Sequence, residues 1–96
     1  MSNRYKKAII DDVVPHNIDA ALQDNLLELF ESAMKTVATT LVREARFETT
    51  DFASAKARGC EGFTLLISRA RTDSRADWSG TFQRGDERLD VMGHLE

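Results

Sequence analysis

The chain has 96 residues, of which 42% are hydrophobic and 30% are charged, and its formal net charge is −3. This length supports one domain with one hydrophobic core, and the slightly negative charge argues against a general binder of nucleic acid or anionic membranes. A single cysteine excludes an intramolecular disulfide, and no apolar run approaches the roughly 18–20 residues of a membrane span, so we expect a cytoplasmic protein without membrane contact.

The first apolar groups of the chain lie on either side of Asp11 and Asp12 and are followed by Pro15. A proline stops a helix that would otherwise run into it and biases the preceding residue towards extended geometry. We therefore predict a short strand or an extended arm over Lys7–Val14.

The longest periodic stretch runs from Asn17 to Arg46 and contains neither Gly nor Pro. Its apolar residues recur at the three- and four-residue spacing of a helix, and Asn17 is a suitable N-cap. Asp19 suits the positive end of the helix dipole, and Arg43 suits the negative end. We predict one long helix over this stretch.

Two features of this predicted helix are unusual. A helix from Asn17 to Arg46 would be about 45 Å long, whereas a domain of this size is only about 33 Å across. Its apolar stripe also drifts, so a single flat partner cannot cover both halves. Three interpretations remain open: the helix breaks near the β-branched residues 36–42, its second half binds a second copy of the chain, or Thr36–Phe47 is not helical.

After Phe47, the sequence predicts a short helix that is capped by Thr49 or Thr50 and ends at Arg58, because Gly59 suits the left-handed position that follows a helix. A strand over Ala45–Thr50 is the weaker alternative.

From Gly62 onward the apolar residues alternate, which predicts strands. Three runs, Phe63–Arg71, Trp78–Arg84 and Arg88–Met92, are separated by polar turns, and Gly80 could mark a bulge. The predicted fold class is therefore α+β, with the long helix and the short helix packed on a three-stranded antiparallel meander. We expect a single domain over residues 1–94 and leave out residues 95–96, which could be a remnant of cloning.

No catalytic, cofactor or metal site is predicted. His16 and His94 are isolated in the sequence, Asp11 and Asp12 lack a third ligand at a recognised spacing, and Cys60 has no assured basic neighbour to activate it. The tripeptide Arg84-Gly85-Asp86 is interpreted as a turn that requires glycine.

A group of arginines on the predicted meander is the best candidate for binding an anionic partner, although interleaved acidic residues could neutralise it. The group consists of Arg69, Arg71, Arg75, Arg84 and Arg88.

Our first hypothesis is a protein-interaction or regulatory module that binds itself, as a homodimer, or another protein through the second half of the long helix. The candidate contact residues are Met34, Val37, Ala38, Leu41 and Val42. The second hypothesis is a nucleic-acid-binding protein that uses the arginine group. The third is a small oligomeric enzyme whose site forms between subunits.

Overall fold

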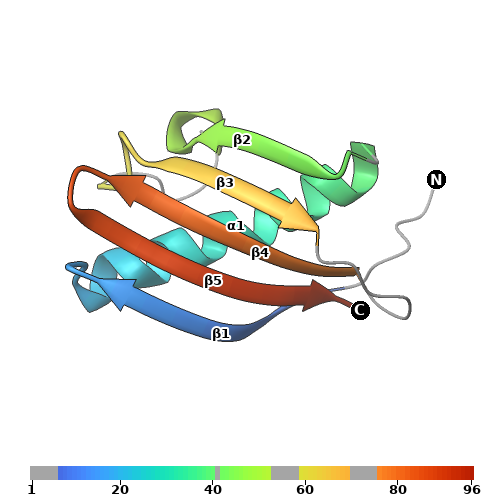
Figure 1. Cartoon of the computed structure of the whole chain (residues 1–96), viewed down its shortest axis with the longest axis horizontal. Coiled ribbons are helices and arrows are strands. Elements are labelled where there is room, and N and C mark those ends of the chain that lie inside the picture. The colour runs from blue at the N-terminus through green and yellow to red at the C-terminus, as the bar shows by residue number, and fades with distance from the viewer. Residues whose placement is uncertain (1–6, 41, 53–58, 70–75) are drawn as a thin grey trace.

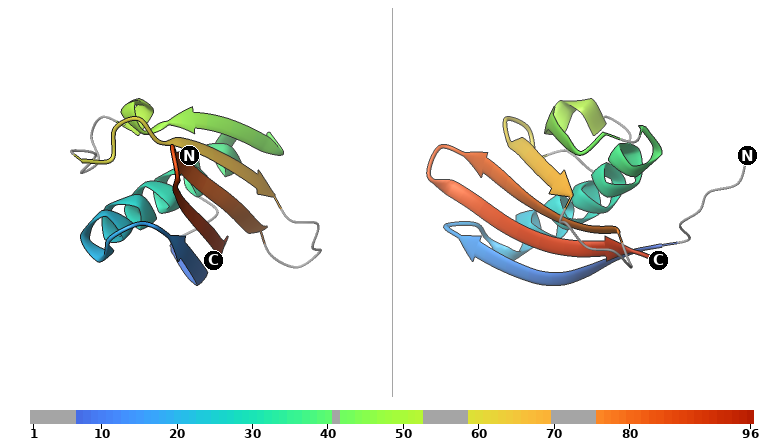
Figure 2. Two further views of the ribbon diagram at one scale, coloured as in Figure 1. Left: turned by 60° about the vertical axis from the view of Figure 1, so that its left-hand side comes forward. Right: turned by 45° about the vertical axis from the view of Figure 1, so that its right-hand side comes forward.

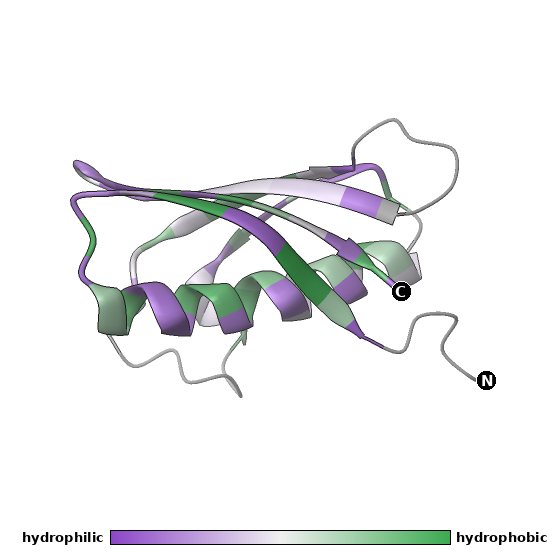
Figure 3. Cartoon of the chain, turned by 90° about the horizontal axis from the view of Figure 1, so that it is seen from below, coloured by the Kyte–Doolittle hydropathy of each residue, from purple (hydrophilic) through white to green (hydrophobic). Residues whose placement is uncertain are grey.

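A five-stranded antiparallel sheet carries one long helix along one of its faces, and no helix of the described residues covers the other face (Figures 1 and 3). This computed structural model describes residues 7–40, 42–52, 59–69 and 76–96. The elements in chain order are β1 (Ala8–His16), α1 (Ala20–Thr40), β2 (Glu44–Glu48), the 3₁₀ helix η1 (Thr49–Phe52), β3 (Thr64–Arg69), β4 (Ala76–Arg84) and β5 (Glu87–Leu95).

The strands lie in the order β1-β5-β4-β3-β2, so β1 and β2 form the two edges of the sheet (Figure 2). The α+β class is confirmed, but the three-stranded meander is wrong, because β1 and β2 extend it on both sides. The segment predicted over Lys7–Val14 as a short strand or an extended arm is a strand, Ala8–His16. Leu95, which lies outside the predicted range 1–94, is buried and pairs with Ala8.

Helix α1 ends at Thr40, which is earlier than the predicted Arg46. At about 1.5 Å per residue its 21 residues span roughly 32 Å, which fits within the longest extent of the molecule, 35 Å. The end of the helix is rich in threonine, and the hydroxyls of Thr36 and Thr39 donate to carbonyls one turn earlier. Such β-branched residues have reduced helix propensity, and residues 44–48 instead pair with β3.

The start of α1 also differs from the prediction. Asp19, and not Asn17, caps the helix, because its carboxylate accepts a hydrogen bond from the N–H of Leu22 over 2.9 Å. Asn17 has a φ of 64°, which lies in the left-handed region, and its side chain donates to Asp86 in the β4–β5 turn. Of the predicted short helix, only Thr49–Phe52 is described, as one 3₁₀ turn, and residues 53–58 lie outside the described residues.

The core lies between α1 and the helix-facing side of the sheet. Phe30 of α1 packs directly on Gly80 of β4, where an added Cβ would lie 2.5 Å from the Phe30 ring. Gly80 pairs in register with Ile67 and Val91, so it does not form the predicted bulge. Its role is to let the helix approach the sheet closely.

Among the described residues, none of the helical segments has the length and apolar character needed to cross a membrane.

Candidate interaction edge at β2

Strand β2 is a short edge strand whose side chains alternate between the two faces of the sheet. Ala45 and Phe47 are half-buried and pack against the core on the helix side. Glu44, Arg46 and Glu48 are exposed on the other face. This alternation follows from the period of two along a strand and matches the weaker of the two predictions for this stretch.

The backbone groups of β2 also alternate, between β3 and the free edge. At its two ends, the carbonyl of Arg43 accepts from the N–H of Arg69 over 3.0 Å, and the N–H of Thr49 donates to the carbonyl of Phe63 over 3.1 Å. Odd-numbered residues therefore direct their backbone groups towards β3. Those of the even-numbered residues Glu44, Arg46 and Glu48 point away from the sheet.

One of these three outward positions is closed by the chain itself. The N–H of Glu48 donates to the Asp51 carboxylate over 2.9 Å. Within the described part of the chain, β2 pairs with β3 alone, and no hydrogen bond reaches the outward N–H and C=O groups of Glu44 and Arg46. These two residues form the open edge.

The opposite edge of the sheet is obstructed over the second half of β1, residues 11–16, although no hydrogen bond of the described residues reaches the outward groups of Ala8 and Ile10. Its pairing with β5 shifts by one residue between Ile10 and Asp12, so Asp11 bulges out of the ladder. The N–H of Val13 is taken by the Asp12 carboxylate over 3.0 Å, and Pro15 has no N–H to offer. A bulge, a proline and adjacent charges are the features by which sheets prevent pairing at an edge.

A shallow hollow of about 370 Å³ lies beside the open edge, over β2 and β3. Its lining residues are Glu44, Ala45, Arg46, Leu66, Ile67 and Ser68. Leu66 is 52% exposed, faces Arg46 across the two strands and supplies an apolar contact beside the charged side chains of β2. The hollow thus suits one side chain of a bound strand.

A second cluster joins Asp11 and His94, which lie far apart in the sequence. Nδ1 of the buried His94 lies 2.8 Å from the Asp11 carboxylate, and Nε2 lies 3.5 Å from Glu96. The bulge in β1 brings Asp11 to this position, and only long-range strand pairing could have revealed it. Among the described residues, no group of three or more acidic, histidine or cysteine side chains is arranged to hold a metal ion.

The predicted arginine group is not brought together as one patch. Arg84 is held by Glu87 over 2.8 Å and donates to the carbonyl of Glu61 over 2.6 Å. Arg88 donates to Asp90 over 3.1 Å. Arg69 lies 6.0 Å from the Trp78 ring centroid, on the helix side of the sheet. Arg71 and Arg75 lie outside the described residues.

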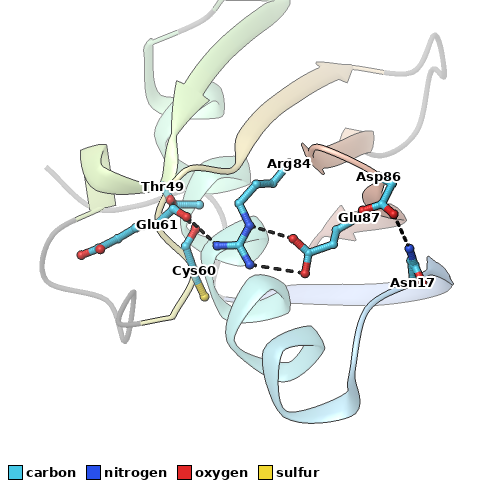
Figure 4. A network of polar contacts seen from close by, with 7 residues as sticks. All are labelled: Asn17, Thr49, Cys60, Glu61, Arg84, Asp86 and Glu87. Carbon is cyan, nitrogen blue, oxygen red and sulfur yellow. Dashed lines mark hydrogen bonds and ion pairs between the residues drawn. The ribbon is translucent and has the colours of Figure 1, made fainter.

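Arg84 belongs to a polar network that joins the loop before β3 to the β4–β5 hairpin (Figure 4). In the same network, the hydroxyl of Thr49 donates to the carbonyl of Cys60 over 2.6 Å. Burial raises the pKa of the Cys60 thiol, and the Arg84 charge and a hydrogen bond with Asn25 offset only part of this effect. A buried neutral thiol is a poor nucleophile, so this network is structural.

The helix residues predicted to contact a partner have different environments. Met34 and Val37 are buried in the chain's own core. Ala38 is half-buried, Val42 is 43% exposed just before β2, and Leu41 lies outside the described residues. The second half of α1 therefore offers little apolar surface, and the exposed part of this set lies beside the open edge.

Comparison of the chain with family models, with curated proteins and with solved structures found no match in any of the three.

Proposed function

We propose that this chain is a small protein-interaction module that binds an extended protein segment along the open edge of β2. An added strand would exchange hydrogen bonds with the N–H and C=O groups of Glu44 and Arg46, and one of its side chains would enter the adjacent hollow. One observation carries the proposal: these outward backbone groups at β2 are open, whereas the edge formed by β1 is interrupted by a bulge at Asp11 and by Pro15.

The other hypotheses have less support from the described residues. A nucleic-acid interface needs arginines that are free to reach phosphates, but Arg84 and Arg88 are engaged with carboxylates of their own chain. An enzyme needs polar groups that converge on an open cleft, whereas His94 is buried between carboxylates. A helix-mediated contact would require Met34 and Val37 to leave the core.

Peptides selected from a random display library provide the test, because strand addition depends on the backbone and tolerates many sequences. We expect the selected peptides to slow amide hydrogen exchange at Glu44 and Arg46. The variant Arg46→Pro should lose this binding, because it removes an outward N–H. Proline is tolerated where an edge strand faces solvent, so the variant should keep its fold.

The matched control is Met92→Thr, which changes an exposed residue on the open face of the sheet but not at its edge. This variant should bind the peptides with unchanged affinity. Peptides that protect other amides, or a selection that yields no binder, would contradict the proposal.

A further inference from the structure

We infer that the strand accepted at this edge is β2 of a second copy of the chain, which pairs antiparallel about a two-fold axis at Ala45. The inference rests on the proposed function and names its partner. Two observations, the pattern of open backbone groups and the order of charges along β2, together select one register.

Hydrogen bonding restricts the register first. In an antiparallel pair, residues that exchange hydrogen bonds must both direct their backbone groups towards the partner, so even-numbered residues of one β2 must face even-numbered residues of the other. A register centred on Phe47 would pair Arg46 with Glu48, and a register centred on Arg46 would pair Glu44 with Glu48. Both require the N–H of Glu48, which Asp51 already occupies.

A register centred on Ala45 avoids this conflict. It pairs Glu44 with Arg46 of the second copy and, by symmetry, Arg46 with Glu44. Each of these pairs exchanges two backbone hydrogen bonds, and all the groups involved are open among the described residues.

The charges favour the same register. With Ala45 on the axis, Glu44 faces Arg46 twice, and opposite charges on directly opposed residues stabilise a strand pair. With Arg46 on the axis, two arginines face each other and Glu44 faces Glu48, so every charged pair is repulsive. With Glu44 on the axis, two glutamates face each other.

The side chains at the centre also fit. Ala45 would face its own copy as a non-hydrogen-bonded pair, in which the two Cα atoms approach to about 4.5 Å, and a methyl group is small enough for that approach. Val42 and Phe47, which are exposed and half-buried respectively, lie at the ends of the paired segment. The two sheets would then join into one continuous sheet.

Pairing of so short a segment buries less than the roughly 1,600 Å² of a standard interface, so we expect a weak, reversible dimer. Analytical ultracentrifugation from about 10 µM to 1 mM, a range that corresponds to weak association, is the appropriate measurement. The wild-type protein should shift from the mass of one chain towards the mass of two.

Charge exchange tests the register. Glu44→Arg alone and Arg46→Glu alone each replace two attractive pairs by two repulsive ones and should weaken the dimer by about tenfold or more. The double variant Glu44→Arg/Arg46→Glu restores opposite charges and should recover wild-type association. The matched control is Glu48→Lys, which faces the uncharged Val42 in this register and takes no part in the Glu44–Arg46 pairs, so it should leave the dimer unchanged.

The outcomes separate the inference from the proposed function. A wild-type protein that remains monomeric at 1 mM, or a double variant that fails to recover association, overturns the self-pairing. If the selected peptides still protect Glu44 and Arg46 in that case, the proposed function stands. If no peptide protects them either, both are overturned. An effect of Glu48→Lys as large as that of Arg46→Glu would contradict the Ala45 register.

Discussion

The Asp51 carboxylate accepts a hydrogen bond from the backbone N–H of Glu48 over 2.9 Å and thereby closes the end of an otherwise open edge strand. The contact is local, since it joins residues three apart, but its consequence is long-range. It leaves Glu44 and Arg46 as the positions on β2 where an incoming strand can make both of its backbone hydrogen bonds.

The first prediction concerns this contact. Asp51→Ala should release the N–H of Glu48, so its amide exchange should accelerate, and the unfolding free energy should fall by roughly 0.5–1.5 kcal/mol, the net value of one hydrogen bond. Native-state hydrogen exchange and urea denaturation measure the two effects. Asp24→Ala, on the exposed side of α1, is the control and should change neither.

The second prediction concerns the close approach of α1 to the sheet. Gly80→Ala should destabilise the fold by about 1–3 kcal/mol, because the new methyl group would overlap the Phe30 ring. Adding Phe30→Leu should recover part of that loss, since the two positions share one space. Ser79→Ala, the exposed neighbour of Gly80, provides the control. Additive losses in the double variant would show that the two residues do not compete for space.

The third prediction concerns the contact between β1 and β5. Asp11→Ala should lower the unfolding free energy by about 1–2 kcal/mol, because it removes a hydrogen-bond partner from the buried His94 ring. Thermal denaturation at pH 7 measures the change. A variant with unaltered stability would mean that the bulge in β1 does not depend on this contact.

The fourth prediction is a pH dependence. Burial pushes the pKa of Asp90 upward, but hydrogen bonds from Thr81 and Arg88, together with the charges of Arg88 and His16, outweigh burial and leave the pKa lowered. A lowered pKa in the folded state adds stability that is present above the unfolded value and is lost as the pH falls through the folded value.

Asp90→Asn should therefore be less stable than wild type at pH 7, and the difference should shrink as the pH falls below the ordinary aspartate pKa of about 3.9. Because Asp90 is partly solvated, we expect a loss below about 1 kcal/mol. Urea denaturation at pH 7 and at acid pH measures the difference in stability between the variant and wild type. A difference of the same size at both pH values would contradict this assignment.

Local patterns predicted much of the fold. The helix, the strands after Gly62 and the extended segment before Pro15 are present, because their periodicity, caps and turns are properties of adjacent residues. The end of α1 was misplaced because Glu44–Glu48 has no strong preference of its own. Its conformation is decided by pairing with β3, which is a tertiary effect that outweighs helix propensity.

The candidate site was less predictable, for a related reason. An edge strand is defined by which neighbour it lacks, and that depends on the order of all the strands. The sequence predicted an apolar contact surface that includes Val42, and Val42 does lie beside the edge. The same prediction included Met34 and Val37, but both are buried in the core. The pairing of Asp11 with His94 likewise depends on a bulge in one strand of a long-range pair.

The central claim, self-pairing of β2 about Ala45, is tested most directly by a disulfide across the two-fold axis. Facing Cα atoms of a non-hydrogen-bonded pair lie about 4.5 Å apart, within the span of a disulfide. Two copies of residue 47 would be separated by about 13 Å along the strands. Cys60 is fully buried, so an introduced thiol at the edge would be the one to react.

Under mild oxidation, we predict that Ala45→Cys forms a covalent dimer that a reducing agent dissolves, and that Phe47→Cys under the same conditions does not. Efficient crosslinking through residue 47, or no crosslinking through residue 45, would contradict the account.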